Sequence, residues 1–510
     1  MKYKISSFWL IVIGIVIAKL TIHFLTSTTY ELHRDEMLYF AMGDHLSFGY
    51  ASTPPLIGFL AFISRTLFGY SEFGIKLFPA LIGAASIVII ALMVKEFGGG
   101  KLAILIAGVG FLVPGAFLRS NSLFQPVSFD QFFWLLSAYL VLRMVNTNNL
   151  KLWLWIGFVF GLAFLNKYAI LFFALAIVVA ILISTHRKVL FSKYFLLGML
   201  ITLIVAMPNL IWQYNHNWPV VHHMIELQRY QLVNNTVANF FLDQMLNCAA
   251  SGLFWLAGLL MILFIPAEKK YRFIAYAFLL VLAIIVLGRG KSYYTLGAYS
   301  MLFAAGGYTM EKYLTGKLVY INYVLIVTSI IGSLIFLPLE LPVASFETVR
   351  KYCDPETGIL PQRWEDGVIH AIPQDYADMT GWKELAWITA QAYNSLNRYE
   401  QEECTIYAEN YGEAGAIEFY GQQYGLPKPI CFHDSYLLWA PDNIGDGPFI
   451  YINDEVGDID DLFENYPEAG RVNDEYFREN GVMVLLCTDP KEQWKDFYAQ
   501  KVNELKSRYR

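Results

Sequence analysis

The sequence carries little charge for its length. Only 16% of its 510 residues are Asp, Glu, Lys or Arg, whereas soluble domains contain about 25%. The formal net charge of −6 is small and gives no indication of a nucleic-acid partner. Acidic residues gather in the last third, whereas the first two thirds are apolar with scattered Lys and Arg. This asymmetry predicts a membrane part followed by a part in water.

Several features of soluble enzymes and metalloproteins are also missing. No Rossmann fingerprint, phosphate loop, repeat or low-complexity segment occurs. There are only five cysteines, and none has zinc-ligand spacing. Four of them follow residue 339, where they allow three disulfide pairings or four free thiols: Cys353, Cys404, Cys431 and Cys487.

Long apolar runs fill the first two thirds of the chain. Each has about 15 to 22 residues, enough for a helix to cross a hydrocarbon layer of about 30 Å, and in lipid only a helix satisfies its own backbone. The first run lacks a small-residue cleavage site, so we interpret it as a retained span. The runs predict about eleven transmembrane helices, near 8–28, 73–94, 102–118, 130–146, 152–166, 168–184, 194–212, 239–265, 273–288, 295–311 and 318–338.

The loops between these runs alternate in charge, which predicts their orientation. Every second loop is basic and should be cytoplasmic by the positive-inside rule. The N-terminus is then cytoplasmic, and the stretch 29–72 and everything after 338 are outside. The basic set contains Lys2 and Lys4, Lys95 and Lys101, Arg143 and Lys151, "HRK" with Lys193, "EKKYR", and Lys312 with Lys317.

The last third of the chain has a different pattern. Short strand-like runs ("CTIYAEN", "PFIYIN", "GVMVLLC") alternate with helix-like stretches, which predicts a small α/β domain. The predicted fold class is an all-α polytopic membrane domain over 1–338, including the outer loop 29–72, followed by an extracytoplasmic α/β domain over 339–510.

The first outer loop contains two adjacent acids, Asp35 and Glu36, in "HRDEMLYFAMG". The run after them predicts an amphipathic helix lying on the membrane surface. A carboxylate here could act as general base on an acceptor hydroxyl, and we assign that role to Asp35. For Glu36, a solvated anchor that marks the end of the first span is an equal alternative.

Two further ionisable residues lie at the ends of predicted spans on the outer side. Asp130, in "FQPVSFDQFFWLL", begins a span, where helix capping competes with a catalytic role; the same holds for Ser128. Lys167 lies in the short "NKY" turn, where snorkelling to the surface is the alternative to ligand binding. A charge at such a depth is costly unless it faces a cavity or a partner.

The outer loop "GRGKSYYT" combines two glycines with Arg289, Lys291, Tyr293 and Tyr294. Arg and Lys suit a phosphate, and glycines allow a close approach of the backbone. Tyrosine alone would be weak evidence, because it is common at membrane interfaces. We predict a phosphate or pyrophosphate site here and count Arg119, on the outer loop 119–129, among the substrate-binding residues. The histidines of "NHNWPVVHH" resemble a metal cluster, but no supporting acid lies at metal-ligand spacing.

These motifs resemble the GT-C glycosyltransferases of bacteria, in the branch related to protein O-mannosyltransferases and lipid A aminoarabinose transferases. The resemblance covers nearly the whole chain and depends on the order and common sidedness of the motifs. The matching stretches are "RDEMLYF" with "STPPLIGFL", "SNSLFQPVSFDQFFWLL", "GLAFLNKYAILFF", "GRGKSYYTLGAYSMLFAAGGY" and "AENYGEAGAIEFYGQQYGLP".

The resemblance implies a bacterial inner-membrane enzyme whose active site faces the periplasm. Its donor would be a polyprenyl-phosphate sugar and its acceptor a lipid, glycan or protein. Asp35 would be the general base, Asp130 a second acid of the site, and Lys167 and "GKSYY" would lie near the lipid phosphate. The chain departs from the aminoarabinose transferases at Ser52 and Thr53, where those proteins carry Glu-Lys, so aminoarabinose transfer fits less well.

The expected chemistry is an inverting displacement. A carboxylate deprotonates the incoming hydroxyl, while cations stabilise the departing phosphate. The sequence identifies no certain cofactor, although Asp35 and Asp130 could bind a divalent metal if they lay close together. The alternative function is a transporter or flippase of a lipid-linked sugar, but no paired repeat typical of transporters is apparent.

Overall fold

The computed structural model describes residues 6–509 and divides into two compact units. The helical unit comprises residues up to Ser27, Lys76–Leu210 and Leu227–Val343. The sheet unit comprises Thr28–Ile75, Ile211–Glu226 and the chain from Ala344 onward. The first outer loop, which we expected to belong to the membrane domain, therefore groups with the C-terminal region. Lys2 and Lys4, which enter the orientation prediction, lie outside the described residues.

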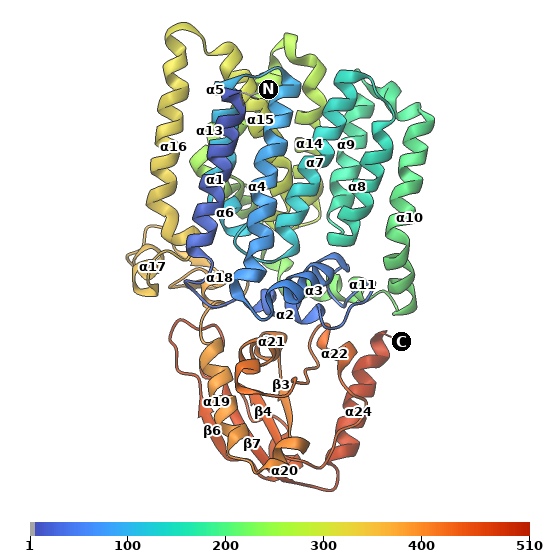
Figure 1. Ribbon diagram of the computed structural model, residues 1–510, viewed down its shortest axis with the longest axis vertical. Coiled ribbons are helices and arrows are strands. Elements are labelled where there is room, and N and C mark those ends of the chain that lie inside the picture. Colours follow the sequence, from blue (N-terminus) through green and yellow to red (C-terminus); the bar gives the residue numbers. More distant parts are fainter. Residues whose placement is uncertain (1–5, 510) are drawn as a thin grey trace, which may run out of the picture. The chain divides into compact units, whose positions relative to one another are not determined.

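Each of the eleven predicted apolar runs coincides with one or more helices (Figure 1). These helices are α1 Ser7–Thr26, α4 Glu72–Phe97, α5 Lys101–Leu112, α6 Gly115–Ser120, α7 Pro126–Thr147, α8 Leu152–Asn166, α9 Ile170–Ile183, α10 Lys193–Asn215, α12 Val237–Asn247, α13 Gly252–Phe264, α14 Arg272–Leu287, α15 Leu296–Tyr313 and α16 Val319–Glu340. Helix α11, Pro219–Tyr230, follows α10 and crosses the division between the units.

The predicted number of transmembrane helices is not confirmed. Within residues 6–509, five helices are both long and apolar enough to cross a membrane, and a sixth is added if α12 and the segment Ala249–Phe264, bent by 62°, count as one span. Helices α5, α8 and α9 have only 12, 15 and 14 residues, less than the roughly 20 that a perpendicular span needs. Several apolar helices in one chain still indicate a multi-pass membrane protein.

Helix α15 forms the centre of the helical unit. Its residues from Leu296 to Met310 are all buried, and it packs against α5, α7 and α13. Small residues allow the close approach: a Cβ on Gly306 would lie 2.0 Å from the carbonyl oxygen of Phe254 on α13. Such small-residue contacts are typical of helices packed in membranes.

The sheet unit contains a five-stranded sheet, as the alternating pattern predicts. Its order is β3-β4-β7-β5, with β6 also paired to β7; β3 and β4 are parallel, and the other pairs are antiparallel. A separate antiparallel pair, β1 and β2, precedes it. The strands are β1 Gln362–Arg363, β2 Ile369–His370, β3 Thr405–Ala408, β4 Phe449–Asn453, β5 Phe463–Asn465, β6 Glu468–Arg471 and β7 Met483–Pro490.

Helices cover both faces of this sheet. Helix α24 buries Trp494 and Tyr498 against Phe449 and neighbouring side chains. Helix α19 packs on β4, β6 and β7, and α21 packs on β3. All five cysteines are free and buried, so of the two alternatives the structure has free thiols. The helices are α2 Arg34–Met42, α3 Leu56–Phe68, α17 Phe346–Cys353, α18 Gln374–Ala377, α19 Trp382–Asn394, α20 Arg398–Glu403, α21 Tyr411–Tyr420, α22 Tyr436–Trp439, α23 Ile459–Leu462 and α24 Trp494–Lys506.

Helix α2 corrects one prediction. The run after Asp35 is helical, but it packs against α21 and is buried instead of lying on the membrane surface. Gly415 on α21 permits this contact, because a Cβ there would lie 2.7 Å from the Cβ of Met37. The exposed apolar side chains of this region come after α2: Leu46 and Phe48 lie in the following loop, and Phe59 and Leu67 lie on α3.

Candidate functional site

Asp35 lies in the first turn of α2, in the sheet unit, and a capping box fixes that turn. The His33 Nδ1 atom accepts a hydrogen bond from the backbone N–H of Asp35 at 3.1 Å, and the Glu36 carboxylate accepts one from the N–H of His33 at 3.0 Å. Glu36 is fully buried, so it is not the solvated anchor that we considered. The capping box that Glu36 forms with His33 fixes the first turn of α2, from which the Asp35 side chain projects.

The Asp35 carboxylate, which is partly exposed, accepts a hydrogen bond from the Tyr411 hydroxyl at 2.9 Å. The guanidinium of Arg34 lies over the Tyr411 ring, 4.6 Å from its centre. Burial, and secondarily the neighbouring acids, raises the pKa of the Tyr411 hydroxyl well above 10, although Arg34 opposes the shift. Tyr411 therefore stays protonated and can orient the carboxylate as a donor.

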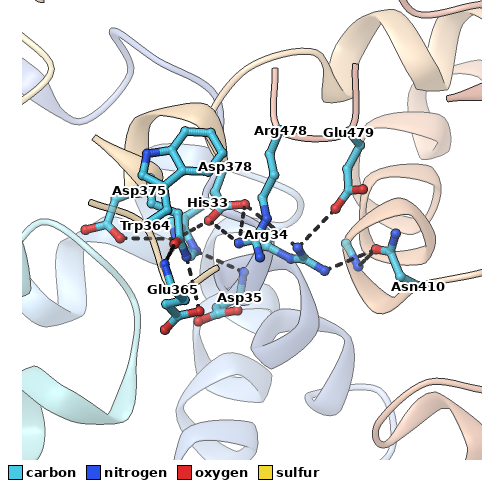
Figure 2. Close-up of polar contacts among 12 residues, drawn as sticks. His33, Arg34, Asp35, Trp364, Glu365, Asp375, Asp378, Asn410, Arg478 and Glu479 are labelled. Carbon is cyan, nitrogen blue, oxygen red and sulfur yellow. Dashed lines mark hydrogen bonds and ion pairs between the residues drawn. The ribbon is translucent and has the colours of Figure 1, made fainter. Parts of the chain in front are cut away.

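Asp378 is the centre of the charge cluster beside Asp35. Arg478 donates to both carboxylate oxygens at 3.1 and 3.3 Å, and His33 Nε2 lies 3.6 Å away. Arg34 lies 3.9 Å from Asp378 and donates to Glu479 at 3.0 Å and to Asn410 at 3.3 Å. Figure 2 shows Arg34 reaching between these groups. Burial raises the pKa of Asp378, and His33, Arg478 and Arg34 oppose that rise.

His33 connects the helix cap to this cluster. Burial lowers its pKa, but Asp35, Asp378 and the other nearby acids outweigh burial and raise it. The cap requires an unprotonated Nδ1, because that atom accepts the Asp35 N–H. The remaining proton is therefore on Nε2, which faces Asp378. Protonation of Nδ1 would remove the hydrogen bond from the Asp35 N–H that caps the start of α2.

The helical unit holds the other predicted acid, Asp130. It is buried and accepts a hydrogen bond from Trp134 Nε1, one turn later, at 3.0 Å. Helix α7 begins at Pro126 and its cap, Gln125, makes no side-chain cap bond, so the capping alternative for Asp130 is wrong. Ser128 is not a cap either, since it donates to the Gln125 carbonyl at 3.4 Å.

Lys167 lies where α8 ends. Asn166 donates to the Pro126 carbonyl at 2.9 Å and so joins the end of α8 to the start of α7. The Lys167 ammonium lies 5.3 Å from the Tyr293 ring centre and 4.8 Å from that of Tyr294. It also interacts electrostatically with Asp130 and Lys291. The ammonium thus faces aromatic rings of the "GRGKSYY" loop, and a ligand-binding role for Lys167 stays a prediction.

That loop is held by polar contacts from the preceding segment. Lys291 donates to Gln231 at 2.6 Å, and Gln244 donates to the Ser292 carbonyl at 3.1 Å. Arg289 is exposed and has a positive φ of 53°, a backbone conformation that residues other than glycine rarely adopt. We name Asp130, Lys167, Lys291, Tyr293 and Tyr294 the cationic cluster.

The remaining predicted residues have different surroundings. Arg119, on α6, donates to the Leu339 carbonyl at 2.6 Å and lies 3.7 Å from the Glu340 carboxylate, so it joins α6 to the end of α16. Asp35 and Glu36 belong to the sheet unit, whereas the cationic cluster and Arg119 belong to the helical unit.

The structure gives no support to a histidine metal cluster. Within residues 6–509, no group of three or more His, Cys, Asp or Glu side chains is placed to hold a metal ion. His216 bonds the Trp212 carbonyl at 2.8 Å, and His222 bonds that of Asn217 at 3.1 Å.

The sequence did not indicate three residues that surround Asp35: Tyr411, Asp378 and Arg478. They come from positions more than 300 residues away along the chain. One local signal was present, since Asn410 and Glu413 have the spacing of a capping box and form one at the start of α21. That cap positions Tyr411 as the first residue of the helix.

Comparison with known proteins agrees with this fold and with the sequence motifs. Residues 52–212 match the family described as dolichyl-phosphate-mannose-protein mannosyltransferase. The lipid A galacturonosyltransferase RgtD of Rhizobium johnstonii is 27% identical over 190 residues, which are 37% of this chain and 40% of that protein. The chain thus aligns with less than half of this curated relative's length.

Two solved structures cover nearly the whole chain. ArnT from Cupriavidus metallidurans in the apo state superimposes with a TM-score of 0.63 at 14% identity, over 93% of this chain and 97% of ArnT. Its complex with undecaprenyl phosphate gives 0.62 at 14% identity, over 94% and 98%. The protein therefore has the fold of ArnT. The expected resemblance to PMT-type GT-C glycosyltransferases is confirmed.

Proposed function

We propose that this protein is an inverting glycosyltransferase of the membrane. It would move a sugar from a polyprenyl-phosphate carrier to a lipid, glycan or protein acceptor on the periplasmic face of the inner membrane. The observation that carries the proposal is the cationic cluster, in which Lys167 lies against Tyr293 and Tyr294 within electrostatic reach of Lys291 and Asp130. The match of residues 52–212 and the ArnT fold support it.

For the helical unit we propose binding of the donor's phosphate. Two ammonium groups attract a phosphate, and charge-assisted hydrogen bonds are roughly twice as strong as neutral ones. Their positive charge stabilises the leaving phosphate as its bond to the sugar breaks. Asp130 balances this charge and, through Trp134, stays fixed on α7.

For the sheet unit we propose that Asp35 is the general base. Its carboxylate is partly exposed and is oriented by a tyrosine that remains a donor. Asp35 would take the proton of the acceptor hydroxyl while that oxygen forms the new bond at the anomeric carbon. The phosphate leaves from the opposite face, so the anomeric configuration inverts. Glu36 supports the base through the helix cap.

The alternative is a flippase, which would move the lipid-linked sugar without breaking a bond. Mass spectrometry of envelope lipids and glycans, with and without the gene, separates the two. A transferase predicts an acceptor that loses one sugar residue in the deletion strain. The same acceptors in both strains, with lipid-linked sugar redistributed between the leaflets, would favour the flippase.

A further inference from the structure

A cavity lies in the sheet unit, apart from the Asp35 cluster. Its volume is about 380 Å³, within the range of about 300–1,000 Å³ that is usual for small-molecule sites. The start of α4 forms one side, and α19 and the end of α21 form the others. The side chains that matter here are Tyr70, Glu72, Lys383, Phe419, Gln422 and Gln423.

Glu72 is the fixed acceptor in this cavity. Its Oε1 atom accepts a hydrogen bond from the Tyr420 hydroxyl at 3.0 Å and pairs with the Lys383 ammonium at 2.9 Å. Tyr420 is buried and itself accepts the Leu32 N–H at 2.8 Å. Since these contacts are on Oε1, the second oxygen of Glu72 remains as an acceptor for a ligand.

Further polar groups surround this carboxylate. Lys383 has three donor hydrogens, and its side chain is 49% exposed. Gln422 and Gln423 are exposed and each carries an amide with both donors and an acceptor. The rings of Tyr70 and Phe419, 5.8 Å apart, supply an apolar surface. The cavity thus combines an aromatic wall of two tilted rings with several hydrogen-bond donors and acceptors.

The charged groups around the cavity favour a neutral ligand over a charged one. Glu31 accepts the backbone N–H groups of Trp382 and Lys383 at 2.8 and 3.2 Å, and it interacts electrostatically with Glu72. Glu72 and Lys383 form an ion pair, so their charges offset each other. Burial raises the pKa of Glu31 to about 7, so near neutral pH this carboxyl carries only part of a negative charge. Neither an anionic nor a cationic ligand would therefore meet a full unpaired charge of opposite sign in the cavity. A neutral ligand with many hydroxyl groups fits best.

We propose that this cavity binds an uncharged saccharide unit of the acceptor. The hydroxyls would bond Glu72, Lys383 and the two glutamine amides, while the apolar face of the sugar ring lies against the aromatic wall. The proposal rests on the proposed function in one respect, since only a glycosyltransferase has an acceptor.

The test is binding of the detergent-solubilised full chain to a printed array of neutral, acidic and amino saccharides, without any donor. The wild type should bind neutral saccharides. The double variant Gln422→Leu/Gln423→Leu should lose roughly five- to fiftyfold in affinity, because two side-chain amides no longer form hydrogen bonds. Both residues are exposed, so folding is retained. Gln391→Leu, an exposed glutamine on α19 that is not part of the cavity, is the matched control and should bind as the wild type does.

The proposal would be overturned by no binding of neutral saccharides, by binding of acidic saccharides alone, or by equal binding of the double variant and the wild type. Lys167→Met should bind the array normally. If Lys167→Met did not bind the array, the saccharide would bind at the donor site, which also contradicts the proposal. If sugar transfer were disproved while the double variant still lost binding, the cavity would remain a saccharide site and only its assignment to an acceptor would fail.

Discussion

The two acids with proposed roles in transfer are held in opposite ways. Asp130, in the helical unit, is fixed by Trp134 four residues later. Asp35, in the sheet unit, is bonded by Tyr411, which is 376 residues away in the sequence. The first arrangement follows from helix periodicity, whereas the second exists only once the C-terminal region has folded around α2. Asp35 therefore depends on packing between distant parts of the chain, whereas Asp130 is held within a single helix.

The largest change in stability should come from Asp378→Asn. The substitution leaves Arg478, Arg34 and His33 without their buried anionic partner, and breaking such a buried pair costs about 3–5 kcal/mol. We expect a clear drop in the Tm of the purified protein. Asp375→Asn is the control, because Asp375 is 31% exposed and lies 3.9 Å from His33. Equal Tm values for the two variants would mean that the cluster does not hold the sheet unit together.

A smaller effect, on substrate binding, is expected from Lys167→Met. Loss of one cation near the phosphate should raise the KM for the donor about ten- to a hundredfold, with little change in Tm. The measurement is the transfer rate against donor concentration. Lys193→Met, a lysine at the start of α10, should leave KM unchanged. A normal donor KM for Lys167→Met would remove the phosphate role of the cationic cluster.

The pH dependence of stability should reveal the raised pKa of Glu31. Burial raises the pKa of this carboxyl from 4.5 to about 7, so the folded protein binds the proton more tightly than the unfolded chain does. The resulting stability is complete below about pH 4.5 and is lost as the pH rises toward 7. Between pH 5 and 8, the Tm of the wild type should therefore fall more than the Tm of Glu31→Gln. Parallel curves would contradict the shift.

The smallest effect is expected from the exposed pair Arg398–Glu402 on α20. The two groups are 3.4 Å apart, with side chains 89% and 64% exposed. Such surface pairs contribute little, so Arg398→Ala should leave Tm and transfer unchanged. A Tm loss as large as that of Asp378→Asn would show that exposure does not separate weak from strong ion pairs in this protein.

The sequence was sufficient for features that depend on neighbours in the chain. Apolar runs located the helices, and the alternation of strand-like and helix-like stretches located β3, β4 and β7. The "NKY" and "GRGKSYY" motifs located residues whose side chains meet around Lys167. The roles assigned to them stay predictions. The count of spans was not confirmed, because an apolar run does not reveal where a helix is interrupted, as between α12 and α13.

Features that depend on distant contacts could not be predicted. The pattern of α2 is compatible with a membrane surface, and only its contacts with α21 and α3 explain why Met37 and Phe40 are buried. Arg119 was grouped with the substrate cations by its charge, but its partners are at the end of α16, more than 200 residues later. Charge and predicted sidedness do not distinguish a ligand-binding cation from one that joins two helices.

The most direct test of the central claim compares Asp35→Asn with the wild type. Membranes containing each protein are given a labelled polyprenyl-phosphate sugar and the acceptor identified by mass spectrometry, and the initial rate of transfer is measured. The variant keeps an oxygen for Tyr411 but loses the base, so the rate should fall by about 10²–10⁴ with an unchanged Tm, while Asp454→Asn, an exposed acid of the same unit, transfers normally. A normally folded Asp35→Asn protein that transfers sugar at the wild-type rate would contradict the account.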